Sequence, residues 1–163
     1  MSAAREPRTP AQWWCLLGGW TLLLVGLVGF AVDSSFHHGS SVMGHDLIVF
    51  EVNGWHNLVH IASGLLLLAG AGTRRRAKLV ALLFGTAYGV VAVAGLVNGN
   101  EVFQLIPVDA ADNALHVVLS ALSLLVGLVS RSRYDWQLAS SYRLRARMTA
   151  HAGRAGHGTP QPR

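Results

Sequence analysis

Four apolar runs separated by polar segments dominate the chain. The two longest cover residues 13–32 and 79–97, and neither contains a formal charge. At a rise of about 1.5 Å per residue, helices of this length cross a hydrocarbon core about 30 Å thick. The runs 58–72 and 114–129 are shorter, so each needs the polar residues just before it to complete a crossing. The pattern predicts four transmembrane helices, over about residues 13–32, 54–72, 79–97 and 112–129.

The placement of the charges predicts how these helices cross a cell membrane. All thirteen Lys and Arg residues lie before the first run, between the second and third runs, or after residue 130. Six of the eight acidic residues lie in the other two loops or at their edges. Because cytoplasmic segments collect Lys and Arg, we expect both termini to be cytoplasmic and both acidic loops to face outward. The expected organisation is a cytoplasmic segment 1–12, a four-span membrane domain 13–130 and a cytoplasmic tail 131–163.

The basic tail gives the chain a pI of about 10.4. Since membrane topology already accounts for the basic residues, we do not expect nucleic-acid binding. Residues 134–148 are expected either to lie as an interfacial helix on anionic lipid or to be mostly disordered with the rest of the tail. Gly85 and Gly89 form a GxxxG pair, which we assign to packing inside the bundle, while a homo- or hetero-oligomer remains open.

An internal repeat relates the entrances of the second and fourth runs. "VNGWHNLVHIASG" aligns without a gap with "VDAADNALHVVLS", at a constant spacing of 56 positions. The alignment pairs Asn53 with Asp109, His56 with Asp112, Asn57 with Asn113 and His60 with His116. The predicted fold is an all-α polytopic four-helix bundle built from two tandem helical hairpins. The paired polar residues would then lie at equal depth, at the outer ends of the second and fourth spans.

This polar cluster contains the residues that can carry chemistry. His56 and His60 share a helix face, as do Asp112 and His116, because residues four apart are neighbours on a helix. Together they form a ligand set suited to Zn²⁺ or another first-row metal, oriented by Asn57 and Asn113. Alternatively, His60 and His116 would be axial ligands of a haem, or the cluster would relay protons or hold a polar ligand.

A purely structural interpretation of the same residues is our leading hypothesis. Asn and Asp are the residue types that cap helix N-termini, and five such residues stand at the two entrances: Asn53, Asn57, Asp109, Asp112 and Asn113. His60 and His116 would then hydrogen-bond across the repeat. The cluster would organise the bundle or a partner interface without catalysing a reaction. We find no catalytic motif, and the loop histidines His37, His38 and His45 match no strong metal-binding motif.

Three segments resemble a known family. They are "VNGWHNLVHIASGLL", "LFGTAYGVVAVAGL" and "DNALHVVLSALSLL", and the resemblance to the small actinobacterial membrane proteins called domain of unknown function 4383 covers roughly residues 13–129. The matching residues are Asn53, His56, Asn57, His60, Gly64, Gly85, Tyr88, Asp112, Asn113 and His116. Ser120 stands where we expect the family's glycine. The resemblance implies four membrane helices and supplies no established activity.

Overall fold

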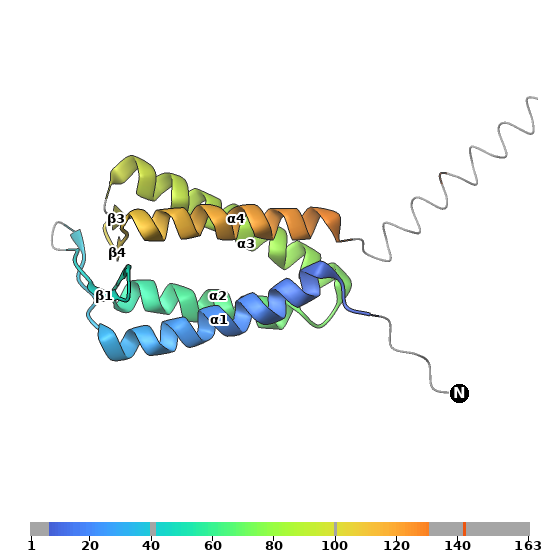
Figure 1. Ribbon diagram of the computed structural model, residues 1–163, viewed down its shortest axis with the longest axis horizontal. Helices are drawn as coiled ribbons and strands as arrows, with labels where there is room; N and C mark the ends of the chain where they lie inside the picture. The colour runs from blue at the N-terminus through green and yellow to red at the C-terminus, as the bar shows by residue number, and fades with distance from the viewer. Residues whose placement is uncertain (1–6, 40–41, 100, 131–141, 143–163) are drawn as a thin grey trace, which may run out of the picture. The chain divides into compact units, whose positions relative to one another are not determined.

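The computed structural model describes residues 7–39, 42–99, 101–130 and 142, and within them four helices form most of the structure (Figure 1). The helices are α1 (Pro10–Val32), α2 (Gly54–Gly70), α3 (Arg74–Asn98) and α4 (Ala110–Val129). A helix is therefore present at each of the four predicted spans. The predicted interfacial helix at residues 134–148 lies outside the described residues, apart from Tyr142.

All four helices begin before the apolar runs of the sequence, because capping rather than hydrophobicity decides where a helix starts. The side chain of Thr9 accepts a hydrogen bond from the Gln12 N–H, and Pro10 occupies the first helical position of α1. Thr73 caps α3 in the same way, so Arg74 and the basic residues after it form the first turns of this helix. Arg and Lys are good helix formers, and they extend α3 beyond its apolar segment.

Three of the helices, α1, α3 and α4, are long and apolar enough to cross a membrane. Their apolar side chains are largely exposed on the surface of the protein: Leu24, Leu83 and Leu125 each expose more than half of their area. A lipid environment accounts for this exposure, and the chain is a membrane protein. Helix α2 has 17 residues, or about 26 Å of helix.

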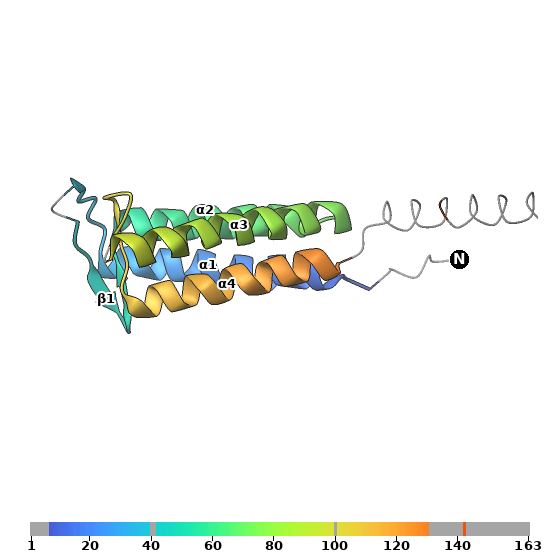
Figure 2. The same cartoon turned by 90° about the horizontal axis from the view of Figure 1, so that it is seen from above.

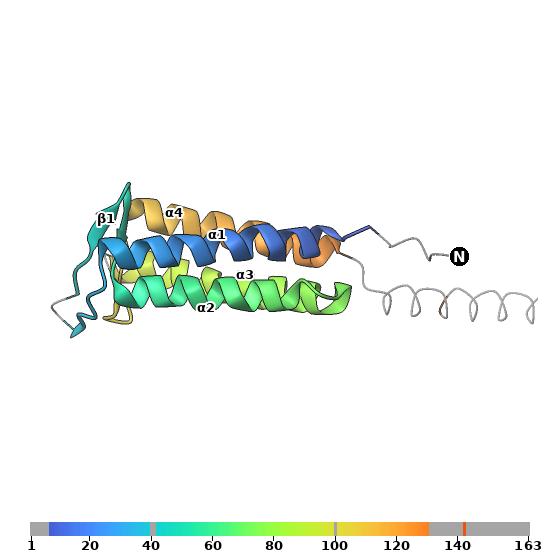
Figure 3. The same ribbon diagram turned by 90° about the horizontal axis from the view of Figure 1, so that it is seen from below.

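The helices lie side by side, with α1 packed along α2 and α3 packed along α4 (Figures 1 and 2). The start of α1 lies beside the end of α4, where the Ala11 N–H donates to Ser130 Oγ at 2.9 Å. The opposite end of the helices carries the loops after α1 and α3, and Figure 3 shows these loops together. We call this end the hairpin end, after the two short β-hairpins in these loops.

Two short β-hairpins at the hairpin end were not predicted. Strand β1 (His45–Leu47) pairs antiparallel with β2 (Phe50–Val52), and β3 (Glu101–Val102) pairs with β4 (Ile106–Pro107). Strands this short give little periodicity in the sequence, and their turns contain non-glycine residues with positive φ angles. These are Ile48, Phe103 and Gln104. Because a β-branched residue rarely adopts this conformation, nothing in the sequence indicates a turn at Ile48.

Small and hydroxyl-bearing residues face the interior of the helical bundle. Ser120 and Ser123 of α4 are buried, and their hydroxyls donate to the Gly85 and Ala81 carbonyls of α3 at 2.7 and 2.9 Å. These bonds satisfy the hydroxyls where no water is at hand, as is typical of helices packed in lipid. The apolar core beside them contains Leu67, Phe84 and Tyr88.

Glycines allow the helices of each packed pair to approach closely, and the contacts of the two pairs correspond. A Cβ atom on Gly19 of α1 would lie 2.8 Å from Leu68 of α2, and one on Gly85 of α3 would lie 2.8 Å from Leu124 of α4. Nearer the hairpin end, the space a Cβ would need at Gly29 is filled by the Asn57 carboxamide. The Asn113 carboxamide does the same at Gly95.

Gly29→Ala should therefore destabilise the protein. The added methyl group overlaps the buried Asn57 side chain, and overpacking of this kind costs about 1–3 kcal/mol. Thermal unfolding in detergent measures the loss. Gly18→Ala on the same helix is the matched control, because its Cβ would meet Leu67 at an ordinary 3.6 Å. Equal stability of the two variants would contradict the packing described here.

Candidate functional site

The first turns of α2 and α4 begin inside the protein and are capped by side chains. Asn53 Oδ1 accepts a hydrogen bond from the His56 N–H at 2.9 Å, and Asp109 Oδ1 accepts one from the Asp112 N–H at 2.7 Å. Asp112 Oδ2 in turn accepts from the Asp109 N–H at 3.3 Å, which completes a capping box. Asn53 is fully buried, so its cap bonds a backbone N–H that water does not reach.

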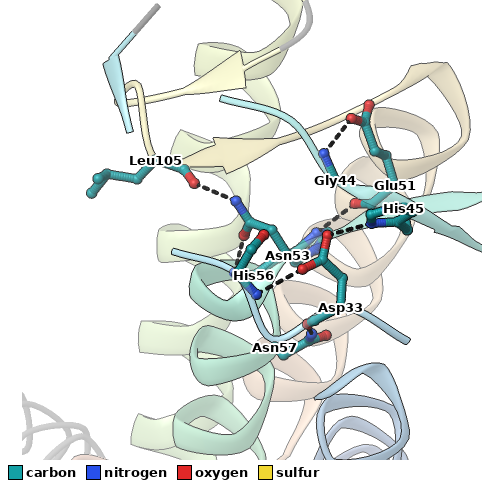
Figure 4. Close-up of polar contacts among 9 residues, drawn as sticks. Asp33, Gly44, His45, Glu51, Asn53, His56, Asn57 and Leu105 are labelled. Atoms are coloured by element: carbon teal, nitrogen blue, oxygen red, sulfur yellow. Dashed lines mark hydrogen bonds and ion pairs between the residues drawn. The ribbon is translucent and has the colours of Figure 1, made fainter. Parts of the chain in front are cut away.

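Asp33, which follows α1, connects the first loop to α2 (Figure 4). Its backbone carbonyl accepts a hydrogen bond from Asn57 Nδ2 at 2.9 Å. Its carboxylate accepts from the Ser35 N–H and from His45 Nδ1, both at 2.7 Å. Burial alone would raise the pKa of Asp33, but the hydrogen bonds from Ser35 and His45 outweigh it and lower this pKa below its ordinary value.

Two further hydrogen bonds link the first loop and α2 to the second loop and α4. Asn53 Nδ2 donates to the Leu105 carbonyl at 2.9 Å, and the Glu51 N–H donates to Asp112 Oδ2 at 3.2 Å. Asn53 and Asp112 therefore each have two functions. Each takes part in a helix cap, and each makes a hydrogen bond between the α1–α2 half and the α3–α4 half of the molecule. These bonds fix the position of α2 relative to α4 at the hairpin end.

Below these caps, three histidines meet in the interior. His56, His60 and His116 are 2, 7 and 4% exposed, and one ring nitrogen from each lies within 4.8 Å of the other two. The ring centroids of His56 are 4.5 Å from His60 and 6.0 Å from His116. Tyr88 of α3 lies edge-on to His116 at 5.4 Å, and its buried hydroxyl has no hydrogen-bond partner among the described residues.

The hydrogen bond of His56 defines its tautomer. Its Nδ1 lies 2.9 Å from the Glu51 carbonyl, which can only accept, so Nδ1 carries the proton and the lone pair is on Nε2. Nε2 is buried without a hydrogen-bond partner among the described residues, and so are Nδ1 of His60 and Nδ1 of His116. Three neighbouring imidazoles thus each have a buried, unpaired ring nitrogen, which is costly unless something binds there.

The structure brings together three of the four predicted metal ligands. Asp112 lies outside the group of histidine nitrogens, and its Oδ2 accepts from two backbone N–H groups. The carboxamide oxygens of Asn57 and Asn113 are buried without a hydrogen-bond partner in the described part of the chain. His37 and His38 are exposed, and His45 bonds Asp33.

Two groups that shape the site were not predicted from the sequence. The Glu51 carbonyl orients His56, but any residue supplies a carbonyl, so its role has no sequence signal. Asp33 was assigned only to an acidic loop, and its bond to Asn57 depends on how the chain turns after α1.

A family model described as a domain of unknown function matches residues 12–129 of the chain. No curated protein and no solved structure matches the chain significantly. The family match covers α1 from its third residue onward and the whole of α2, α3 and α4, and it includes all the polar residues described at the hairpin end.

Replacing Asn53 should separate its two functions. Asn53→Ala removes the cap and the bond to Leu105, which together contribute about 2 kcal/mol to the free energy of unfolding. Asn53→Ser retains a capping oxygen and loses only the bond to Leu105, so we expect about half the effect. Chemical or thermal unfolding in detergent compares the two variants. Equal losses would show that the cap contributes nothing.

The Asp33 contacts predict a dependence of stability on pH. A carboxyl whose pKa is lowered on folding stabilises the protein above its unfolded pKa, and this contribution is lost as pH falls through the folded value. The ordinary value is 3.8, so wild type should lose stability relative to Asp33→Asn as the pH falls below about 4 and through the lower folded value. Asp46→Asn, at an exposed acid of β1, is the control. Parallel pH curves for wild type and Asp33→Asn would contradict this expectation.

Proposed function

The chain belongs to the family described as domain of unknown function 4383, and because that description assigns no activity, we propose a function from the site itself. The proposed function is to hold a first-row transition-metal ion within a membrane protein, with His56, His60 and His116 as ligands. One observation supports it above all: three buried imidazoles place ring nitrogens within 4.8 Å of one another, and each imidazole has an unpaired, buried nitrogen.

The chemistry of the three imidazoles suits this function. Neutral imidazole is a ligand for zinc, copper, iron and nickel, and three histidines leave a fourth position for water or another ligand. Metal-bound histidines usually donate their second ring N–H to a carbonyl or carboxylate, and His56 does so to the Glu51 carbonyl. A bound ion would also satisfy nitrogens that otherwise have no partner.

The surrounding polar residues have an organising role in this proposal. Asn53 and Asp109 cap α2 and α4, and Asn57 and Asn113 pack against glycines of the neighbouring helices. They hold the histidine-bearing turns at one depth. Asp112 contributes to the same organisation, because its carboxyl oxygen accepts from the Glu51 and Asp109 N–H groups.

A single ion fits the arrangement better than a haem between His60 and His116. The His116 ring has the His56 ring 6.0 Å away on one side and the Tyr88 ring at 5.4 Å. His60 lies 4.5 Å from the same His56 ring. The two candidate axial ligands therefore pack against a third imidazole and a tyrosine, where a macrocycle would need a flat slot.

The membrane arrangement we propose has four spans, two tandem hairpins and cytoplasmic termini. The corresponding contacts of Gly29 with Asn57 and of Gly95 with Asn113 support the repeat. The basic residues at the start of α3 and the acidic residues of the hairpin end support the orientation. The site would then lie near the outer surface, below the two β-hairpins. Binding of anionic lipid by the tail rests on its seven arginines.

Metal analysis of the purified protein tests the proposal. We expect wild type, reconstituted with Zn²⁺ or Co²⁺ and freed of excess metal, to retain about one ion per chain. His56→Ala, His60→Ala and His116→Ala should each lose this ion. His38→Ala, which removes an exposed loop histidine, should retain it. Bound Co²⁺ should also give the visible absorption bands of a four-coordinate site.

Two outcomes would contradict the proposal. One is wild-type protein that binds no ion under conditions in which it remains folded. The other is an equal metal content in the His60 and His38 variants. A Soret band in protein purified from cells that supply haem would favour the haem alternative.

A further inference from the structure

A cleft of about 410 Å³ lies beside the histidines, between α1, α4 and the β1–β2 hairpin. Its walls include Trp14 and Leu17 from α1, Leu115 and Leu119 from α4, and Ile48 from the turn of the hairpin. Nearly all of the lining is apolar. A volume of this size is within the range of binding sites for small organic molecules.

Hydrogen bonds join the elements around the cleft toward both ends of the helices. At the end opposite the hairpin end, Trp14 Nε1 donates to Ser123 Oγ at 2.8 Å, and the hydrogen bond from the Ala11 N–H to Ser130 Oγ joins α1 to α4. At the hairpin end, the β1–β2 hairpin contributes to the lining and is tied to α4 by the bond of Glu51 to Asp112. A ligand would therefore enter from the side, where the helices face lipid. Water would be unfavourable in so apolar a space.

Two ionisable residues contribute to the lining at the hairpin end, His60 from α2 and Asp112 from α4. A neutral imidazole has one N–H group as well as one lone pair. The N–H of His56 has an acceptor in the Glu51 carbonyl. His60 has no such bond among the described residues, and its Nδ1 is buried and unpaired. Nδ1 is the nitrogen that remains for an ion, so the N–H of His60 is on Nε2, and an acceptor from outside the protein would satisfy that group.

We propose that the cleft binds a neutral, carbonyl-bearing molecule with a hydrocarbon chain, of the quinone class, taken up from the bilayer. The chain lies between α1 and α4, and a carbonyl oxygen accepts a hydrogen bond from His60. A neutral head group suits this end of the cleft better than an ionised fatty acid, because burying a carboxylate without a paired charge in so apolar a space is costly. The proposal does not depend on the metal, because the His60 ring has an N–H with or without an ion.

Filling the cleft tests this inference. Gly18 of α1 lines the cleft, and a Cβ there would make only an ordinary contact of 3.6 Å with Leu67. Gly18→Leu therefore adds a side chain to the wall of the cleft at a position where the Cβ itself fits. Leu115→Trp fills the cleft from α4, in case the first variant does not fold. Ala31→Leu adds bulk to the exposed surface of α1 and is the matched control.

The measurement is the amount of decylubiquinone retained by the full chain in lipid nanodiscs after gel filtration, compared with nanodiscs that lack protein. We expect saturable retention of about one molecule per chain by wild type and by Ala31→Leu, and loss of that retention in both cleft variants. Oleate should be retained less than the quinone.

Metal content, measured on the same samples, separates this inference from the proposed metal site. Gly18→Leu should lose the quinone and keep the ion. Retention of decylubiquinone no greater than that of empty nanodiscs would overturn the inference, whatever the metal content. Unchanged binding in both cleft variants, or equal retention of oleate, would also overturn it.

Discussion

The buried N-termini of α2 and α4 are the constraint on which the rest of the structure depends. The first backbone N–H groups of a helix have no partner within the helix, and at the hairpin end of this protein water does not reach all of them. Asn53 and Asp109 satisfy these groups from within the chain. Asn53 also donates to the Leu105 carbonyl, and Asp112 also accepts from the Glu51 N–H. The residues that cap the two helices therefore also join the α1–α2 half of the molecule to the α3–α4 half.

The histidines contrast with these satisfied caps. His56 lies in the first turn of α2, and His60 and His116 lie one turn further into their helices. The caps therefore determine the depth at which all three imidazoles meet. Next to these capped backbone groups, one nitrogen of each imidazole has no hydrogen-bond partner among the described residues, and neither do the carboxamide oxygens of Asn57 and Asn113. A structural role alone explains the hydrogen bond of His56 to the Glu51 carbonyl but does not explain why the other imidazole nitrogens have no partner. The proposed metal site explains the hydrogen bond and the unpaired nitrogens together.

The sequence predicts the helices and the neighbourhood of the site because both depend on local patterns. Apolar runs indicate the spans, and the spacing of four residues places His56 and His60 on one face. The role of Asp112 shows what local sequence patterns cannot predict. Its spacing from His116 suits a ligand, but its carboxylate bonds the backbone of Glu51, and that contact depends on a β-hairpin with no sequence signal. Helix starts at capping residues such as Thr73 are missed because hydrophobicity does not detect them.

X-ray absorption at the metal edge of the loaded protein tests the central claim most directly, because it reports the ligands themselves. We predict a first shell of nitrogen or oxygen atoms at about 2.0–2.1 Å for zinc, with the outer-shell scattering of three imidazoles per ion. His116→Ala should remove one of the three or abolish binding. A spectrum without imidazole scattering, from an ion bound at full occupancy, would contradict the account.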